Sequence, residues 1–308
     1  MPNDDMEQMR LALIHQVCLH VLNGDITTVQ LEKPNQVLDI GTGTGEWAIR
    51  FAEMYPECEV VGTDISAIAE TKSVPMNVFF EIEDAEDWDR PADSYDLIHF
   101  RYMEGAFTDW NYIYENVFYS LKRKGWIEMH EFDCVEGLAT FLSQFPPESP
   151  AHALQRDLLV AAERSGRPRG IGHLDTQILT DVGFTDVKTN EYLIPITVAE
   201  KTAGKIWLIA LLDSFEATCL RLLTTHMGWE ADECRKACED TARELVNLAR
   251  DPESSQWLQV RMVIVTARKP LAPPAPEPVL EADTSSQSEQ EESPGLHDRT
   301  VHGTEVAA

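Results

Sequence analysis

The sequence lacks any apolar run of the roughly 18 residues that a membrane-spanning helix requires. It also lacks the basic start and apolar stretch of a secretory signal peptide, because Met1–Asp5 contains two aspartates and no basic residue. We therefore expect a cytoplasmic protein with no membrane partner.

Lysine and arginine are scarce in this chain. There are 25 of them against 53 aspartates and glutamates, which gives a formal net charge of −28. A field of that sign repels phosphate backbones, so we expect no direct nucleic-acid partner.

Cysteines are few and scattered. Without a secretion signal, the six cysteines are expected to be reduced thiols. Cys234 and Cys238 stand four residues apart on an expected helix, but no second pair completes a metal-binding spacing. The sequence therefore assigns no metal ligands.

Aromatic residues are absent from the end of the chain. Residues 271–308 are rich in Pro, Ser and Glu and contain no Phe, Tyr or Trp. Such a segment buries too little apolar surface to offset its ordering entropy, so we expect a disordered acidic tail that is available to protein partners. Residues 1–270 are expected to form one folded domain.

Strands and helices alternate along residues 1–270. This order predicts an α/β fold with a parallel sheet and right-handed crossovers. A helical insert over about residues 199–250 separates the last two strands. The expected strands are 36–40, 59–64, 78–82, 95–100, 126–130, 187–196 and 260–267. The expected helices are 5–22, 46–54, 112–120, 151–164, 174–182, 203–226 and 231–248.

A glycine loop, Gly41-Thr42-Gly43-Thr44-Gly45, joins the first strand to the next helix. Glycines let the backbone bend tightly and approach a ligand. The free N–H groups at the start of the helix suit an anionic group such as a carboxylate. The loop is therefore the candidate ligand site, although dinucleotide enzymes use a similar one.

Two acids distinguish between possible ligands. Glu46 occupies the position where a dinucleotide fingerprint has glycine or alanine, and Asp39 directly precedes the loop. Both would repel a diphosphate, whereas Asp39 would pair with the ammonium group of a methionine moiety. A nicotinamide dehydrogenase is therefore disfavoured.

Further candidates follow the second and third strands. The Asp64 carboxylate is placed to accept hydrogen bonds from both hydroxyls of a ribose, and Ile65 to pack on an adenine. Asp84 is placed to bind the adenine amino group, and the Ala85 N–H a ring nitrogen. With Asp39, Gly41, Thr42 and Gly43, these residues form the predicted cofactor site.

The order of these motifs resembles the class I S-adenosylmethionine-dependent methyltransferases, and more narrowly the fungal LaeA-like methyltransferases of secondary metabolism. The resemblance covers about residues 4–270. It implies a Rossmann-like, seven-stranded, mostly parallel sheet whose last strand is antiparallel, S-adenosyl-L-methionine as cofactor, and an N-terminal helix that closes over it. The matching segments are GTGTGEW (41–47), DLIHFR (96–101), LKRKGWIE (121–128), AAERSGR (161–167), VGFTDV (182–187) and VTARKP (265–270).

Methyl transfer from a sulfonium needs the acceptor in line, and a base when the acceptor is a hydroxyl. His130, at the end of the fifth expected strand, is the candidate catalytic base, with His99 and His173 as rivals. Arg101 and Tyr102 could face either the cofactor or the acceptor.

The leading functional hypothesis is methyl transfer to O, N or C of a small molecule in fungal secondary metabolism. The alternative is a LaeA-like nuclear regulator that keeps the cofactor pocket and acts through a protein complex. The acidic tail leaves that alternative open.

Overall fold

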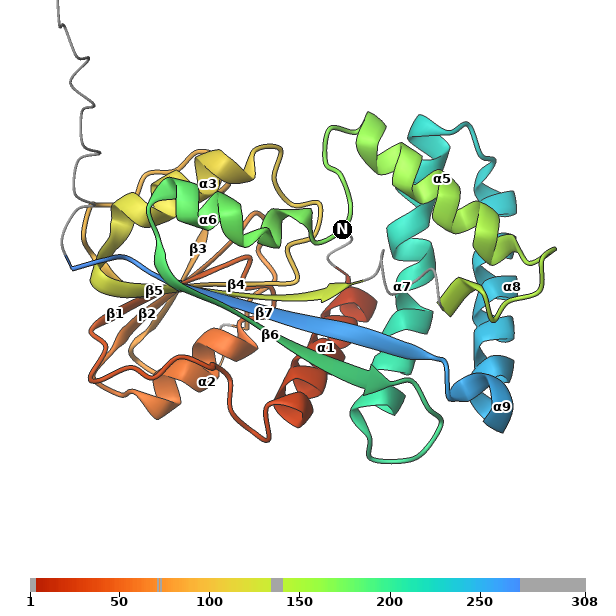
Figure 1. The fold of residues 1–308 in the computed structure, drawn as a ribbon, viewed down its shortest axis with the longest axis horizontal. Helices are drawn as coiled ribbons and strands as arrows, with labels where there is room; N and C mark the ends of the chain where they lie inside the picture. The colour runs from red at the N-terminus through yellow and green to blue at the C-terminus, as the bar shows by residue number, and fades with distance from the viewer. Residues whose placement is uncertain (1–3, 71, 73, 134–140, 272–308) are drawn as a thin grey trace, which may run out of the picture. The chain divides into compact units, whose positions relative to one another are not determined.

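The centre of the protein is a seven-stranded sheet in the order β3-β2-β1-β4-β5-β7-β6 (Figure 1). The computed structural model describes residues 4–70, 72, 74–133 and 141–271. β7 runs antiparallel to both β5 and β6, and the pairs from β3 to β5 are parallel. The strands are β1 (Gln36–Ile40), β2 (Glu59–Asp64), β3 (Val78–Ile82), β4 (Tyr95–Arg101), β5 (Leu121–Asp133), β6 (Thr185–Pro195) and β7 (Gln259–Arg268). The predicted fold class is confirmed.

Helices cover both faces of the sheet. In Figure 1, α3 and α6 lie on one face and α1 and α2 on the other, while α5, α7 and α8 pack together to one side. The helices are α1 (Asp5–Val21), α2 (Glu46–Met54), α3 (Trp110–Ser120), α5 (Pro150–Arg164), α6 (Thr176–Val182), α7 (Ala203–His226), α8 (Ala231–Arg250) and α9 (Pro252–Ser255). None of the described helices is long and apolar enough to cross a membrane.

The central strands form because their side chains are apolar on both faces, as expected for parallel strands that helices cover. In β1, Val37 and Leu38 point to opposite faces, and each is at most 1% exposed. Val37 joins a cluster with Phe51 of α2, and Leu38 joins another with Ile113 of α3. This packing fixes the sheet edge at which the glycine loop begins.

The helical insert has its own core. On α8, Cys234, Cys238, Thr241 and Leu245 recur every three or four residues and are buried. Such spacing places them on one face of the helix, which packs on α5 and α7. The predicted insert is thus a helical layer anchored between β6 and β7.

The largest difference from a predicted boundary is at β5, and the other predicted elements that differ do so by one or two residues at an end. The sequence indicated a turn at Lys124-Gly125 before a strand over 126–130, whereas β5 begins at Leu121, directly after α3. The Leu121 side chain is fully buried. The Lys124 N–H donates to the carbonyl of Lys269 at 2.9 Å, so pairing partners distant in sequence extend the strand. The predicted tail beyond Leu271 lies outside the described residues.

Candidate functional site

The glycine loop leaves the carboxyl end of β1 between β2 and β4. The N–H of Thr42 donates to the carbonyl of Thr63 at 2.9 Å, which ties the loop to β2. Gly41 has φ +70°, a conformation that favours glycine. A Cβ at Gly41 would also collide with the Met103 side chain, which follows β4. The loop therefore depends on glycine for both its shape and its packing.

The N-terminal helix lies against this loop. A Cβ at Gly43, where φ is +57°, would lie 3.2 Å from Cδ1 of Leu11 on α1. His15 of the same helix places its Nδ1 3.1 Å from Nη1 of Arg101 at the end of β4. Burial and the Arg101 charge lower the pKa of His15 to about 3. A neutral imidazole can therefore accept a hydrogen bond from Arg101.

Asp39 connects the loop to β4. Its side chain is almost fully buried, one carboxylate oxygen accepts from Oγ1 of Thr42 at 2.7 Å, and the other lies 2.7 Å from Nδ1 of His99. Both oxygens thus have partners within the protein. The contact predicted between Asp39 and a ligand ammonium group stays a prediction. The structure shows in addition that the Asp39 carboxylate bridges Thr42 and His99.

Asp64 lies where the sequence predicted, at the carboxyl end of β2 and beside the loop. Its two carboxylate oxygens accept from the N–H groups of Gly43 at 3.0 Å and Ser66 at 2.9 Å. The neighbouring Ile65 is 69% exposed, so its side chain is accessible to a ligand. The structure brings these residues together with Gly43, but their contacts with a ribose and an adenine stay predictions.

Asp84 and Ala85 follow β3 in a short turn. One oxygen of Asp84 accepts from the N–H of Glu86 at 3.0 Å. Ala85 is half-buried and packs against the same cluster as Met103. Both residues therefore stand on the loop side of the sheet, and their predicted role at an adenine is untested.

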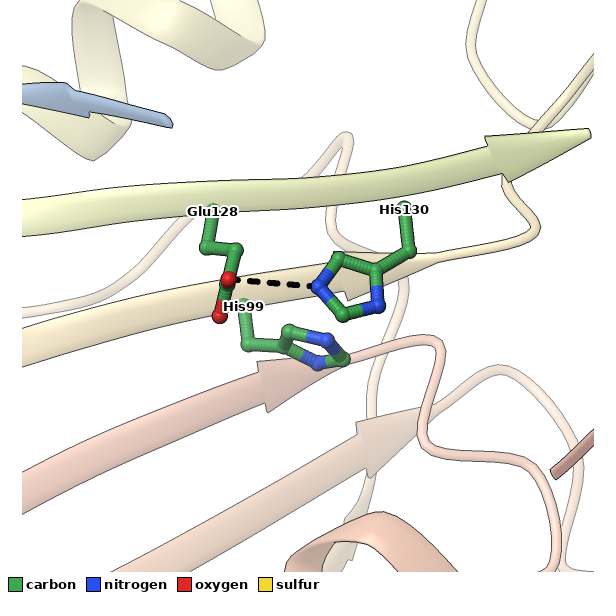
Figure 2. A group of neighbouring side chains, drawn as sticks. All are labelled: His99, Glu128 and His130. Carbon is green, nitrogen blue, oxygen red and sulfur yellow. Dashed lines mark ion pairs between the residues drawn. The ribbon is translucent and has the colours of Figure 1, made fainter. Parts of the chain in front are cut away.

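The candidate base His130 is 1% exposed (Figure 2). Its Nε2 lies 3.3 Å from Oε1 of Glu128. Burial lowers the pKa of His130, but the charge and hydrogen bond of Glu128 together with the Cys18 thiol outweigh burial and raise the pKa to about 9. The same pairing lowers the pKa of Glu128 to about 2, against the effect of burial. A protonated, enclosed imidazole is poorly suited to take a proton, so the base assignment gains no support.

The two rival histidines are also enclosed. His99 is fully buried and stacks on Trp47 with ring centroids 3.8 Å apart, and burial lowers its pKa to about 4. His173 stacks on Trp110 at 4.1 Å, and its Nε2 lies 3.3 Å from Oε1 of Glu131. Each imidazole is therefore held by an aromatic ring and a carboxylate.

A cavity of about 120 Å³ lies between α1, the ends of β4 and β5, and the helical layer. Its walls are mainly apolar, with Phe145, Trp207 and Leu211 among the lining residues. Tyr102 lines the cavity and directly precedes Met103, which packs on the glycine loop. The cavity is therefore adjacent to the predicted cofactor site.

Two polar groups in this cavity were not predicted from the sequence. The hydroxyl of Thr241 is enclosed and makes no hydrogen bond within the described residues. Arg10 forms a buried ion pair with Glu7 at 2.7 Å, and its guanidinium lies 5.1 Å from the Tyr102 ring centroid. The local sequence does not indicate that Thr241 and Arg10 line one cavity, because they come from α8 and α1, which are distant in sequence.

The family model and the similar proteins of known name agree on one family. The family described as "Methyltransferase domain" matches residues 17–187. Methyltransferase pytC of Aspergillus terreus is 32% identical over 241 residues, which cover 75% of this chain and 73% of pytC. The secondary metabolism regulator laeA of Monascus pilosus is 30% identical over 88% of this chain and 74% of its own length. Among solved structures, the cyclopropane synthase MmaA2 of Mycobacterium tuberculosis shares the fold, with a TM-score of 0.51, 16% identity, and coverage of 83% of this chain and 84% of that one.

Proposed function

This chain belongs to the methyltransferase-domain family and is an S-adenosylmethionine-dependent methyltransferase, and on that premise we propose that it methylates an apolar small molecule of fungal secondary metabolism. The observation that carries the proposal is the mainly apolar cavity next to the glycine loop. The similarity to methyltransferase pytC supports an enzymatic role, and the similarity to the secondary metabolism regulator laeA supports the choice of this metabolism.

The residues around the loop fit the cofactor. Gly41 and Gly43 have positive φ angles and carry no Cβ, so the loop backbone itself can approach a ligand. Asp64 and Asp84 supply carboxylate acceptors at the ends of β2 and β3, which suit ribose hydroxyls and an adenine amino group. We assign cofactor binding to these residues together with Asp39, Thr42, Ile65 and Ala85.

The cofactor supplies a methyl group on a positively charged sulfur, so the leaving group needs no proton. The protein's part is therefore to orient the acceptor and exclude water. Trp207 and Leu211 of α7 form apolar walls for the acceptor. The hydroxyl of Thr241, which has no hydrogen-bond partner among the described residues, can hydrogen-bond one polar group on the acceptor. This arrangement favours a mainly apolar acceptor with a single polar anchor.

The test is a labelled-methyl assay on the purified full-length chain. The protein is incubated with methyl-labelled S-adenosylmethionine and fractionated fungal metabolite extracts, and labelled products are identified by mass spectrometry. We expect label in an apolar metabolite, and profiles of a deletion strain should lack the same product. Cofactor binding with no labelled small molecule in any fraction would contradict the proposal.

The regulator alternative comes from the similarity to laeA of Monascus pilosus. It is not favoured over the enzyme, because the family match and the cavity both point to methyl transfer. A cytoplasmic location belongs to the enzyme proposal and a nuclear one to the regulator. Subcellular fractionation together with genome-wide expression in the deletion strain distinguishes the two.

A further inference from the structure

Three ionisable side chains meet beneath the glycine loop. His99 comes from β4, and Glu128 and His130 come from β5 (Figure 2). His99 pairs with Glu128 in the sheet register, and His130 is two residues further on, so all three share one face. Each is at most 1% exposed, and one ligand atom from each lies within 4.8 Å of the others.

The imidazole nitrogens in this cluster are poorly satisfied. Neither Nε2 of His99 nor either ring nitrogen of His130 makes a well-directed hydrogen bond within the described residues. An enclosed polar atom left without a partner costs about 1–3 kcal/mol. Because Nδ1 of His99 is held by Asp39 at 2.7 Å, the lone pair of its Nε2 is available to a ligand.

Outer contacts hold these side chains in place. Asp39 on Nδ1 of His99 reproduces the carboxylate–histidine arrangement found behind metal-bound histidines. The carboxylate of Glu128 accepts from the hydroxyl of Thr27 at 2.5 Å and from the N–H and hydroxyl of Thr28, each at 2.7 Å. Ligating carboxylates are commonly held in the same way.

Two imidazoles and one carboxylate form a ligand set that zinc accepts. No residue pattern in the sequence marks this set, because its members come from two strands, β4 and β5, and meet only when the strands pair.

We propose that His99, Glu128 and His130 bind one divalent transition-metal ion, best matched by Zn²⁺. Neighbouring ligand atoms around a tetrahedral zinc are roughly 3.4 Å apart, and the three ligand atoms here lie within 4.8 Å of one another, so small side-chain movements bring them onto the ion. Binding displaces the proton that Glu128 favours on His130, because a metal-bound imidazole is neutral. The site is closed to solvent, so its role is structural, and it joins β4 to β5 below the loop that carries Gly41.

The experiment uses the full-length chain without a histidine tag. Metal content is measured by mass spectrometry after purification, and the chelator-stripped protein is then titrated with Zn²⁺ and with Co²⁺, whose spectrum reports tetrahedral coordination. The variants are Glu128→Gln and His99→Gln. The matched controls are Glu131→Gln, which changes another buried glutamate, and His173→Gln, which changes another buried histidine.

We expect about one zinc per wild-type chain, and affinity at least about tenfold weaker in Glu128→Gln and His99→Gln but unchanged in both controls. The tetrahedral spectrum of the cobalt protein should disappear in both variants. A stripped wild type that takes up neither ion, or equal uptake by all variants, overturns the site. Because wild-type uptake is measured directly, the test stands even if Glu128→Gln fails to fold. Calorimetry with S-adenosylmethionine tests the proposed function separately.

Discussion

At the scale of single residues, Asp64 provides the sharpest test of the cofactor site. If its carboxylate holds the ribose hydroxyls, Asp64→Ala loses charge-assisted hydrogen bonds worth about 1.5–3 kcal/mol each. We therefore expect affinity for S-adenosylmethionine to fall about tenfold or more, as measured by calorimetry. Asp64→Asn should be milder, because its amide oxygen still accepts one bond.

Asp87 is the control for this substitution, because it is exposed and lies in the turn that follows Asp84. Asp87→Ala should leave affinity for the cofactor unchanged. Equal losses in Asp64→Ala and Asp87→Ala would show that the ribose assignment is wrong.

Gly43 tests the loop itself. Gly43→Val places a branched side chain at φ +57° and beside Leu11, which fills the space next to the loop backbone. We expect cofactor binding to disappear in calorimetry, while circular dichroism shows a folded protein. Gly24→Val imposes similar backbone strain at φ +94° with open space around it, so it should retain full binding. Unchanged affinity in folded Gly43→Val would exclude the loop as the site.

The sequence placed single residues well where strand ends determine their position. Asp64 ends a parallel strand, so its proximity to Gly43 followed from the order of elements. The bridge from Asp39 to His99 was not predicted, because it joins residues on neighbouring strands that are sixty positions apart. For His130, the strand was predicted correctly, but enclosure by Glu128 and α1 depends on the tertiary packing.

At the scale of elements, α1 contains a buried ion pair that stabilises the folded state. The side chains of Arg10 and Glu7 are 1% and 4% exposed. Removing one partner leaves an uncompensated buried charge, so Arg10→Met should lower the free energy of unfolding by about 3–5 kcal/mol in denaturant titrations.

The matched control is Arg50→Met. Arg50 and Glu53 have the same i,i+3 spacing on α2, but both side chains are 51% exposed. The loss there should stay below about 1 kcal/mol. Equal losses of unfolding free energy in the two variants would mean that burial does not determine how much the α1 ion pair contributes to stability.

Helix α7 offers a test of the acceptor cavity. Ala210 lines the cavity and is 1% exposed, whereas the neighbouring Ile209 is 39% exposed. Ala210→Phe should fill the cavity at a stability cost of about 1–3 kcal/mol. We expect methyl transfer to the acceptor to be lost with unchanged cofactor affinity, whereas Ile209→Phe should retain both. Full turnover by Ala210→Phe would place the acceptor elsewhere.

Elements with strong local signals were predicted to the residue. Helices 46–54 and 203–226 and strands 36–40, 59–64 and 78–82 agree with the structure at both ends. Other elements differ by one or two residues at an end, and the largest difference, at residues 121–125, arises because Leu121 is buried and the N–H of Lys124 donates to the carbonyl of Lys269, a residue distant in sequence. Such pairing leaves no mark in the local sequence.

At the scale of the whole molecule, Lys269, close to the end of the described residues, is tied to the rest of the domain by hydrogen bonds. Lys269 is 5% exposed, and its Nζ donates to Asp93 and to the carbonyl of Leu121, each at 2.7 Å. Removal of residues 273–308 spares these bonds, so the melting temperature and cofactor affinity should not change. Removal of 269–308 should lower the melting temperature by several degrees. A clear drop in the shorter truncation would show that the acidic tail contributes to folding.

The insert leaves and re-enters the sheet at one place. Pro195 faces Gln259 across the β6–β7 pair, and the N–H of Ile196 donates to the carbonyl of Leu258 at 2.8 Å. With its ends joined in this way, the closure entropy of the segment changes only slowly with its length. Residues 197–257 can therefore change in length without shifting the register between β6 and β7, provided that the faces of α7 and α8 that pack on α1 and α5 are kept. A chimera made at these two points exchanges the proposed acceptor walls, Trp207 and Leu211, in one continuous stretch of gene.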